Sequence, residues 1–177
     1  MWVFAYGSLI WRPDFVAAET RLARLAGWHR AMCILSTVYR GTPDRPGLVL
    51  GLDRGGSCRG RALRVASADW PAVKAMLDAR ELVTGVYHPR FLPVRLDDGR
   101  RVPAYAFVCA RGQAQYWSGP ADEAVRLIRQ GTGSSGRARD YLASTVEHLA
   151  ALGLADRALG RLLAQVDGPT AGKCKPK

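Results

Sequence analysis

The sequence of 177 residues contains no asparagine, only three histidines and only four cysteines. Without asparagine the chain has no acceptor for N-linked glycans and no catalytic scheme that depends on an asparagine side chain. The cysteines are far apart, form no Cys-x-x-Cys pair and have no histidine at a spacing typical of metal ligands. We therefore expect no metal site and no disulfide, and we expect buried, reduced thiols at Cys33, Cys58, Cys109 and Cys174.

Long apolar runs are missing as well. No segment approaches the roughly 20 apolar residues that a membrane-spanning helix needs, and the N-terminus lacks the basic stretch followed by an apolar core that marks a signal peptide. We expect a cytoplasmic protein with no membrane contact. The length suits one domain with a substantial core, and the content of 48% hydrophobic and 23% charged residues is typical of a globular protein.

The formal net charge of +11 is large, but it is spread along the chain. Arginine supplies 22 of the 26 positive charges, and three of the four lysines lie within 169–177, which we expect to be a disordered basic tail. Nucleic-acid-binding proteins usually gather basic residues and aromatics on one element, and here only two pairs of neighbouring arginines come close. We therefore expect no nucleic-acid partner, whereas attraction of small anions stays open.

Strand patterns dominate the first two thirds of the sequence, and helix patterns dominate the last third. The expected strands are 3–6, 22–36, a hairpin of 48–52 and 58–65 with its turn at 53–57, and a second hairpin of 87–96 and 102–109 with its turn at 97–99. The expected helices are 67–81, with Ser67 as N-cap, and 120–130, 137–152 and 155–166. We predict an α+β fold, a small and mostly antiparallel β-barrel or sheet with surrounding helices, in one domain over 1–168.

The segment 131–136 matches the Gly-x-Gly-x-x-Gly pattern of dinucleotide-binding proteins. That pattern has its mechanical meaning only directly after a strand, where the glycines open a helix below a pyrophosphate. Here an amphipathic helix pattern precedes it. We interpret the segment as a flexible connection between helices, although a loop with many free amides could still line a site.

The strand at 3–6 breaks off in the tight polar turn Tyr6-Gly7-Ser8 before the chain becomes apolar again at Leu9. Glycine lets the backbone approach another group closely, and successive exposed amides can point at an anion. The turn is therefore a candidate anion cradle. Ser8 is a poor candidate nucleophile, because Gly-x-Ser-x-Gly is absent and no histidine has a recognisable partner pattern.

Glu81 is the carboxylate with the most informative surroundings, at the end of the helix predicted over 67–81 and between apolar residues. The negative end of the helix dipole and partial burial would both raise its pKa, as in a general acid/base. The alternative is a surface glutamate paired with Arg80 or another cation. The residues alone favour that alternative.

Several short motifs together resemble the ChaC-like γ-glutamylcyclotransferases, over nearly the whole chain except the tail. In order they are Tyr6-Gly7-Ser8-Leu9-Ile10-Trp11, Tyr39-Arg40-Gly41, Pro46-Gly47-Leu48-Val49, Arg80-Glu81 with Gly85 and Tyr87, Tyr116 with Gly119-Pro120, and Gly133-Ser134-Ser135-Gly136 with Tyr141-Leu142. The resemblance implies a small β-barrel with helices around it. It also implies an enzyme that splits glutathione into 5-oxoproline and cysteinylglycine without metal or cofactor.

The resemblance also implies roles for particular residues. Glu81 would be the acid/base, and the loop of Tyr6, Gly7, Ser8 and Leu9, with Val3 on the strand before it, would bind the γ-glutamyl group. Arg40 would be a further carboxylate partner, and Tyr116 would close the pocket. The loop amides could hold either the α-carboxylate or the oxyanion on the γ-carbonyl, and the sequence does not decide between them.

The chain departs from the animal members in the segment before Tyr39-Arg40-Gly41 and at Val86, where a second glycine often stands. These differences concern how the leaving peptide is held. Cyclotransfer on other γ-glutamyl amides or amino acids therefore stays an alternative, as does a non-catalytic binder of an anionic metabolite. We expect the protein to be a monomer.

Overall fold

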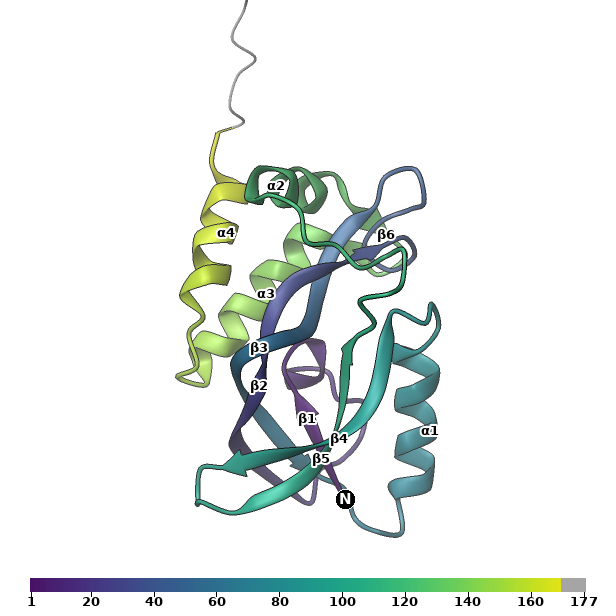
Figure 1. Ribbon diagram of the computed structural model, residues 1–177, viewed down its shortest axis with the longest axis vertical. Helices are drawn as coiled ribbons and strands as arrows, with labels where there is room; N and C mark the ends of the chain where they lie inside the picture. Colours follow the sequence, from purple (N-terminus) through teal and green to yellow (C-terminus); the bar gives the residue numbers. More distant parts are fainter. Residues whose placement is uncertain (170–177) are drawn as a thin grey trace, which may run out of the picture.

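The computed structural model describes residues 1–169, whose strands close into a five-stranded barrel (Figure 1). The order around the barrel is β1 (Trp2–Ala5), β3 (Gly47–Arg64), β2 (Glu19–Ser36), β4 (Tyr87–Leu96) and β5 (Arg101–Cys109). The pairing of β1 with β5 is parallel, and the other four pairings are antiparallel. The predicted α+β fold with a mostly antiparallel barrel is confirmed.

The helices cover the barrel from two sides (Figure 1). The helix α1 (Trp70–Glu81) lies along β4, whereas α2 (Ala121–Gln130), α3 (Ala138–Ala151) and α4 (Arg157–Asp167) gather on the opposite side over the long strands β2 and β3. A short 3-10 helix, η1 (Ser8–Ile10), follows β1 directly. This arrangement brings the end of α1 and the start of α3 to the same region as the turn after β1.

The first predicted hairpin, 48–52 with 58–65, is wrong. These residues form one continuous strand, β3, which pairs with β2 along its whole length. Between the pairs Ala26 with Ser57 and Trp28 with Arg54, Gly27 alone stands opposite Gly55 and Gly56. All three glycines have positive φ, so they form a bulge in the ladder where we had expected a reversal of the chain.

The remaining elements agree with the sequence patterns to within about two residues at most boundaries. The second hairpin is confirmed, with Gly99 at positive φ in its turn. The helix at 67–81 begins later than expected, because Trp70 is its first residue and Asp69, not Ser67, is at the N-cap position. The glycine segment 131–136 is a tight hairpin of β6 (Thr132–Gly133) and β7 (Gly136–Arg137), not a loose connection.

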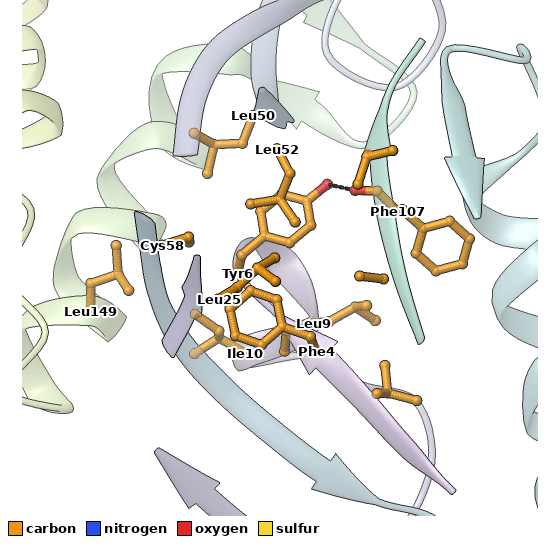
Figure 2. Close-up of a cluster of buried hydrophobic side chains, with 14 of the residues drawn as sticks. Phe4, Tyr6, Leu9, Ile10, Leu25, Leu50, Leu52, Cys58, Phe107 and Leu149 are labelled. Carbon is orange, nitrogen blue, oxygen red and sulfur yellow. Dashed lines mark hydrogen bonds between the residues drawn. The ribbon is translucent and has the colours of Figure 1, made fainter. Parts of the chain in front are cut away.

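The core fills the barrel and continues under the helices α2 to α4. Figure 2 shows the ring of Tyr6 near Leu50 and Leu52, with its hydroxyl donating to the carbonyl oxygen of Phe107 at 2.9 Å. Phe4 and Phe107 are at most 1% exposed. Complete burial of such a side chain contributes about 1.5 to 3 kcal/mol to the free energy of unfolding.

Three of the four cysteines are buried and free, as predicted: Cys33, Cys58 and Cys109. Cys174 and the rest of the predicted tail beyond Pro169 lie outside the described residues. Within residues 1–169, no helix combines the length and the apolar character needed to cross a membrane.

Candidate active site

Two adjoining cavities open between the turn after β1, the end of α1 and the start of α3. The larger has a volume of about 330 Å³, and the smaller, of about 30 Å³, lies beside it over the barrel core. Four residues line both cavities, Ser8, Glu81, Tyr87 and Tyr141. Because these four side chains come from separate parts of the chain, the site exists only in the folded barrel.

Glu81 is the last residue of α1, and its side chain is 19% exposed. Burial raises the pKa of Glu81, and the guanidinium of Arg80, with Nε at 3.1 Å from Oε1, opposes this by lowering it. The structure therefore combines the two interpretations of Glu81 from the sequence, an acid/base with a raised pKa and a glutamate paired with Arg80. The carboxylate is paired with Arg80, but it also lines both cavities with a raised pKa, as expected of a group that exchanges protons near neutral pH.

The turn from Tyr6 to Leu9 forms one wall of the smaller cavity. The Tyr6 carbonyl accepts a hydrogen bond from Arg30 Nε at 2.6 Å, and Ser8 Oγ accepts one from Arg80 at 2.9 Å. The backbone N–H groups of Gly7 and Ser8 donate to no other group within residues 1–169. The hydrogen bonds from Arg30 and Arg80 fix the turn, and its two amide donors stay available for a ligand.

Tyr87 and Tyr141 are functional candidates that sequence reasoning did not select. Together with Tyr6 they place three phenol side chains around Glu81, and burial followed by neighbouring charges, Glu81 among them, raises the pKa of each. They stay neutral hydrogen-bond donors at physiological pH. Their presence in the short motifs was the only sequence signal, because a single tyrosine in a strand or helix is usually a core residue.

Arg40 lines the larger cavity but not the smaller one. Its guanidinium lies over the ring of Tyr141, 5.5 Å from the ring centre, and donates to the Arg137 carbonyl at 3.3 Å. The glycine hairpin supports this wall, because Ser134 and Ser135 donate backbone hydrogen bonds to the carbonyls of Val38 and Tyr39. Ser135 also lines the cavity.

Two predicted binding residues are not among those that line the cavities. Val3 is fully buried in β1, where it is paired with Leu63 and Tyr105. The Tyr116 hydroxyl donates to Asp53 at 2.9 Å. Neither residue lines either cavity, so we leave both out of the site.

No group of three or more His, Cys, Asp or Glu side chains within residues 1–169 is arranged to hold a metal ion. The chemical groups available in the two cavities include the largely buried carboxylate of Glu81, the phenols of Tyr6, Tyr87 and Tyr141, two free backbone amides and the guanidinium of Arg40. These groups suit proton transfer and the binding of an anionic, hydrogen-bonding ligand.

Known structures place this barrel in a defined class. The crystal structure of a γ-glutamyl cyclotransferase specific to glutathione from yeast superimposes with a TM-score of 0.87, covers 94% of this chain and 95% of its own, and is 21% identical in sequence. At that identity the likeness shows a shared fold, the γ-glutamylcyclotransferase barrel.

The family follows from sequence comparison. Residues 1–168 match the family model of ChaC-like proteins, and the chain belongs to that family. It is 36% identical over 167 residues to the glutathione-specific gamma-glutamylcyclotransferase of Escherichia coli strain K12, covering 94% of this chain and 72% of the relative. It is 34% identical to the mouse glutathione-specific gamma-glutamylcyclotransferase 1, covering 80% of this chain and 66% of that one.

Proposed function

We propose that this protein is a glutathione-specific γ-glutamylcyclotransferase, which converts glutathione into 5-oxoproline and L-cysteinylglycine. The observation that carries the proposal is the position of Glu81, a largely buried carboxylate with a raised pKa where the two cavities adjoin. Relatives named for this activity cover most of the chain. A binder of anions would gain nothing from a carboxylate placed there, which favours an enzyme over a non-catalytic binding protein.

The two cavities suit the two parts of glutathione. The smaller, deeper cavity would take the γ-glutamyl group against the turn of Tyr6, Gly7, Ser8 and Leu9. The larger cavity would take cysteinylglycine, with Arg40 available to a carboxylate. The bond to be broken would then lie where the cavities adjoin, beside Glu81.

The reaction exchanges one amide bond for another and consumes no water. Glu81 accepts a proton from the substrate α-ammonium group, and the free amine attacks the γ-carbonyl carbon to form a tetrahedral intermediate. When the intermediate collapses, the bond from that carbon to the cysteine nitrogen breaks and Glu81 returns a proton to the departing nitrogen. The carboxylate then takes the extra proton from the new ring nitrogen, and that proton ends on the cysteinylglycine amine, which leaves as an ammonium group. The nucleophile is already tethered to its target, so the protein need only hold the γ-glutamyl chain curled.

The proposal includes action as a monomer of one domain, because a single chain supplies every residue that lines both cavities. It also includes a cytoplasmic location, where the free thiols of Cys33, Cys58 and Cys109 would stay reduced. No cofactor takes part in the proposed reaction.

The test is mass spectrometry of purified protein incubated with reduced glutathione and no added metal. We expect equal amounts of 5-oxoproline and cysteinylglycine from the wild type, and a loss of about 100- to 10,000-fold in Glu81→Gln, which cannot accept a proton. Glu147→Gln, at an exposed glutamate of α3, is the matched control and should keep full activity.

Three results would contradict the proposal. Free glutamate in place of 5-oxoproline would show a hydrolase and return attention to Ser8. Turnover of γ-glutamyl-alanine without turnover of glutathione would show a different substrate. Full activity in Glu81→Gln would remove Glu81 from the mechanism.

A further inference from the structure

The three tyrosine hydroxyls around Glu81 differ in what they donate to. Tyr6 donates to the carbonyl of Phe107 at 2.9 Å, and Tyr87 donates to the carbonyl of Leu50 at 2.6 Å. A phenol has one proton to donate, so both of these donors are already engaged. The oxygen of Tyr141 accepts from the Leu50 backbone, but its hydroxyl donates to no group in the described part of the chain, although Tyr141 lines both cavities.

The Tyr141 hydroxyl has a defined place in the site. It lies so close to Gly7 that a Cβ atom at that position would come within 3.1 Å of the phenol oxygen. Its ring contacts the guanidinium of Arg40, 5.5 Å from the ring centre, and the ring of Trp11, with centres 6.1 Å apart. A free donor on a side chain that is fixed by two packing contacts is pre-organised for a ligand atom.

The geometry of the reaction identifies which ligand atom that is. Glu81 must reach both nitrogens that are bonded to the γ-carbon in the intermediate, so the γ-carbon must lie beside Glu81. Its oxygen then faces the donors that share both cavities with Glu81. Of the two phenols among them, Tyr87 already donates to Leu50, whereas Tyr141 has a proton to give. A neutral donor suits an oxygen that becomes charged only during the reaction, whereas the permanent charge of Arg40 suits a carboxylate.

We propose, on the basis of the function proposed above, that the Tyr141 hydroxyl donates a hydrogen bond to the γ-carbonyl oxygen of the substrate and stabilises the oxyanion of the tetrahedral intermediate. As the amine nitrogen bonds to the γ-carbon, the π electrons of the carbonyl move to its oxygen. They return when the bond to the cysteine nitrogen breaks. The phenol proton stays on Tyr141 throughout, so the step needs no further acid or base.

The first experiment is the variant Tyr141→Phe, assayed with glutathione beside the wild type. Loss of one oxyanion donor lowers kcat by about 100- to 1,000-fold, and we expect the KM for glutathione to stay within a few-fold of the wild-type value. Tyr105→Phe is the matched control, since it loses a hydroxyl that donates to Asp78 away from both cavities. It should keep the wild-type kcat.

The second experiment separates this role from a structural one. An analogue of glutathione with sulfur in place of the γ-carbonyl oxygen accepts hydrogen bonds weakly. We expect the wild type to lose much more of its kcat than Tyr141→Phe does when the analogue replaces glutathione, because the variant has no donor to lose. Since each comparison is made within one variant, a partly unfolded preparation does not change the ratio.

An unchanged kcat in Tyr141→Phe, or an equal penalty for the sulfur analogue in both proteins, would overturn this role while the cyclotransferase function stands. A wild type that makes no 5-oxoproline would instead overturn the proposed function and this inference with it. The two failures are therefore distinguishable in the same set of assays.

Discussion

Arg80 Nε lies 3.1 Å from the carboxylate oxygen of Glu81, the residue that follows it in the chain. The same guanidinium donates to Ser8 Oγ at 2.9 Å and to Asp14 Oδ2 at 2.7 Å. Asp14 has a φ of 60°, the one positive value at a non-glycine residue in 1–169. One arginine therefore joins the proposed acid/base to the turn after β1 and to the strained segment beyond it.

This pairing predicts a shift in the pH dependence of activity. Glu81 must be ionised to accept the first proton, and the charge of Arg80 lowers its pKa against the effect of burial. In Arg80→Gln the pKa of Glu81 should rise, so the acid limb of kcat/KM against pH should move to higher pH. Arg95→Gln, at an exposed arginine of β4, is the control. An acid limb that stays in place would show that Arg80 does not tune Glu81.

The raised pKa of Glu81 also predicts a stability difference that depends on pH. Below the ordinary pKa of glutamate, about 4.3, the folded and unfolded states both hold the proton and burial of the carboxyl has no ionisation cost. As the pH rises, the unfolded state loses its proton first, so the wild type loses stability up to the raised pKa of the folded state. Glu81→Gln escapes this loss.

The measurement is Tm against pH for the wild type and Glu81→Gln. We expect the Tm of the variant minus that of the wild type to increase between about pH 4 and neutrality. The same subtraction for Glu147→Gln should give a nearly flat line, since that side chain is exposed. A difference that shrinks as the pH rises would contradict the pKa direction.

Gly7→Ala tests the close approach of the turn to α3. The added methyl group would lie 3.1 Å from the Tyr141 hydroxyl and 3.7 Å from Leu50 Cδ1, so the phenol must move by a few tenths of an ångström. We expect kcat to fall by about tenfold while the fold persists, because catalysis depends steeply on the placement of its groups. Gly160→Ala provides the contrast, since nothing lies within 4 Å of its added methyl in α4.

The contrast variant should gain stability. Replacing a glycine within a helix by alanine stabilises by about 0.5 to 1 kcal/mol, so Gly160→Ala should raise Tm with kcat unchanged. Thermal melts and steady-state assays of both variants are sufficient. Equal kcat values in Gly7→Ala and the wild type would show that the contact with Tyr141 does not affect turnover.

Tyr116→Phe tests whether this residue belongs to the site at all. The Tyr116 hydroxyl donates a hydrogen bond to Asp53, and the same carboxylate also accepts a hydrogen bond from Arg111 Nε at 2.6 Å. We expect a loss of about 1 kcal/mol in the free energy of unfolding, typical of one hydrogen bond, with kcat and KM unchanged. Denaturant unfolding and steady-state kinetics provide both numbers. A raised KM for glutathione would restore Tyr116 to the binding site.

Several parts of the fold follow from patterns that are local in the chain. The hairpin of β4 and β5 is one, because alternating strands and a turn with Gly99 lie next to each other in the sequence. The four helices are others, since spacing such as that of Trp70, Val73 and Leu77 makes one apolar face regardless of what it packs against. The turn Tyr6-Gly7-Ser8 and the end of α1 at Glu81 belong to the same group.

Features that depend on contacts between distant segments could not be predicted from local sequence patterns. Gly55 and Gly56 take positive φ in a bulge as readily as in a turn, and only the pairing of β3 with β2 selects the bulge. Val3 and Tyr116 are compatible with a binding site by residue type, but barrel closure buries Val3 and the hydrogen bond to Asp53 engages Tyr116.

The candidate active site also combines features set by local sequence patterns with features set by contacts between distant segments. The carboxylate of Glu81 and the amides of the turn are recognisable in the sequence, because residue type and local conformation are enough to suggest their chemistry. That Tyr141 of α3 has a hydroxyl proton without an acceptor beside Gly7 and Glu81, in the described part of the chain, follows only when the barrel closes and α3 packs over it. Contacts between distant segments arise from packing of the whole chain, and no local pattern of residues encodes them.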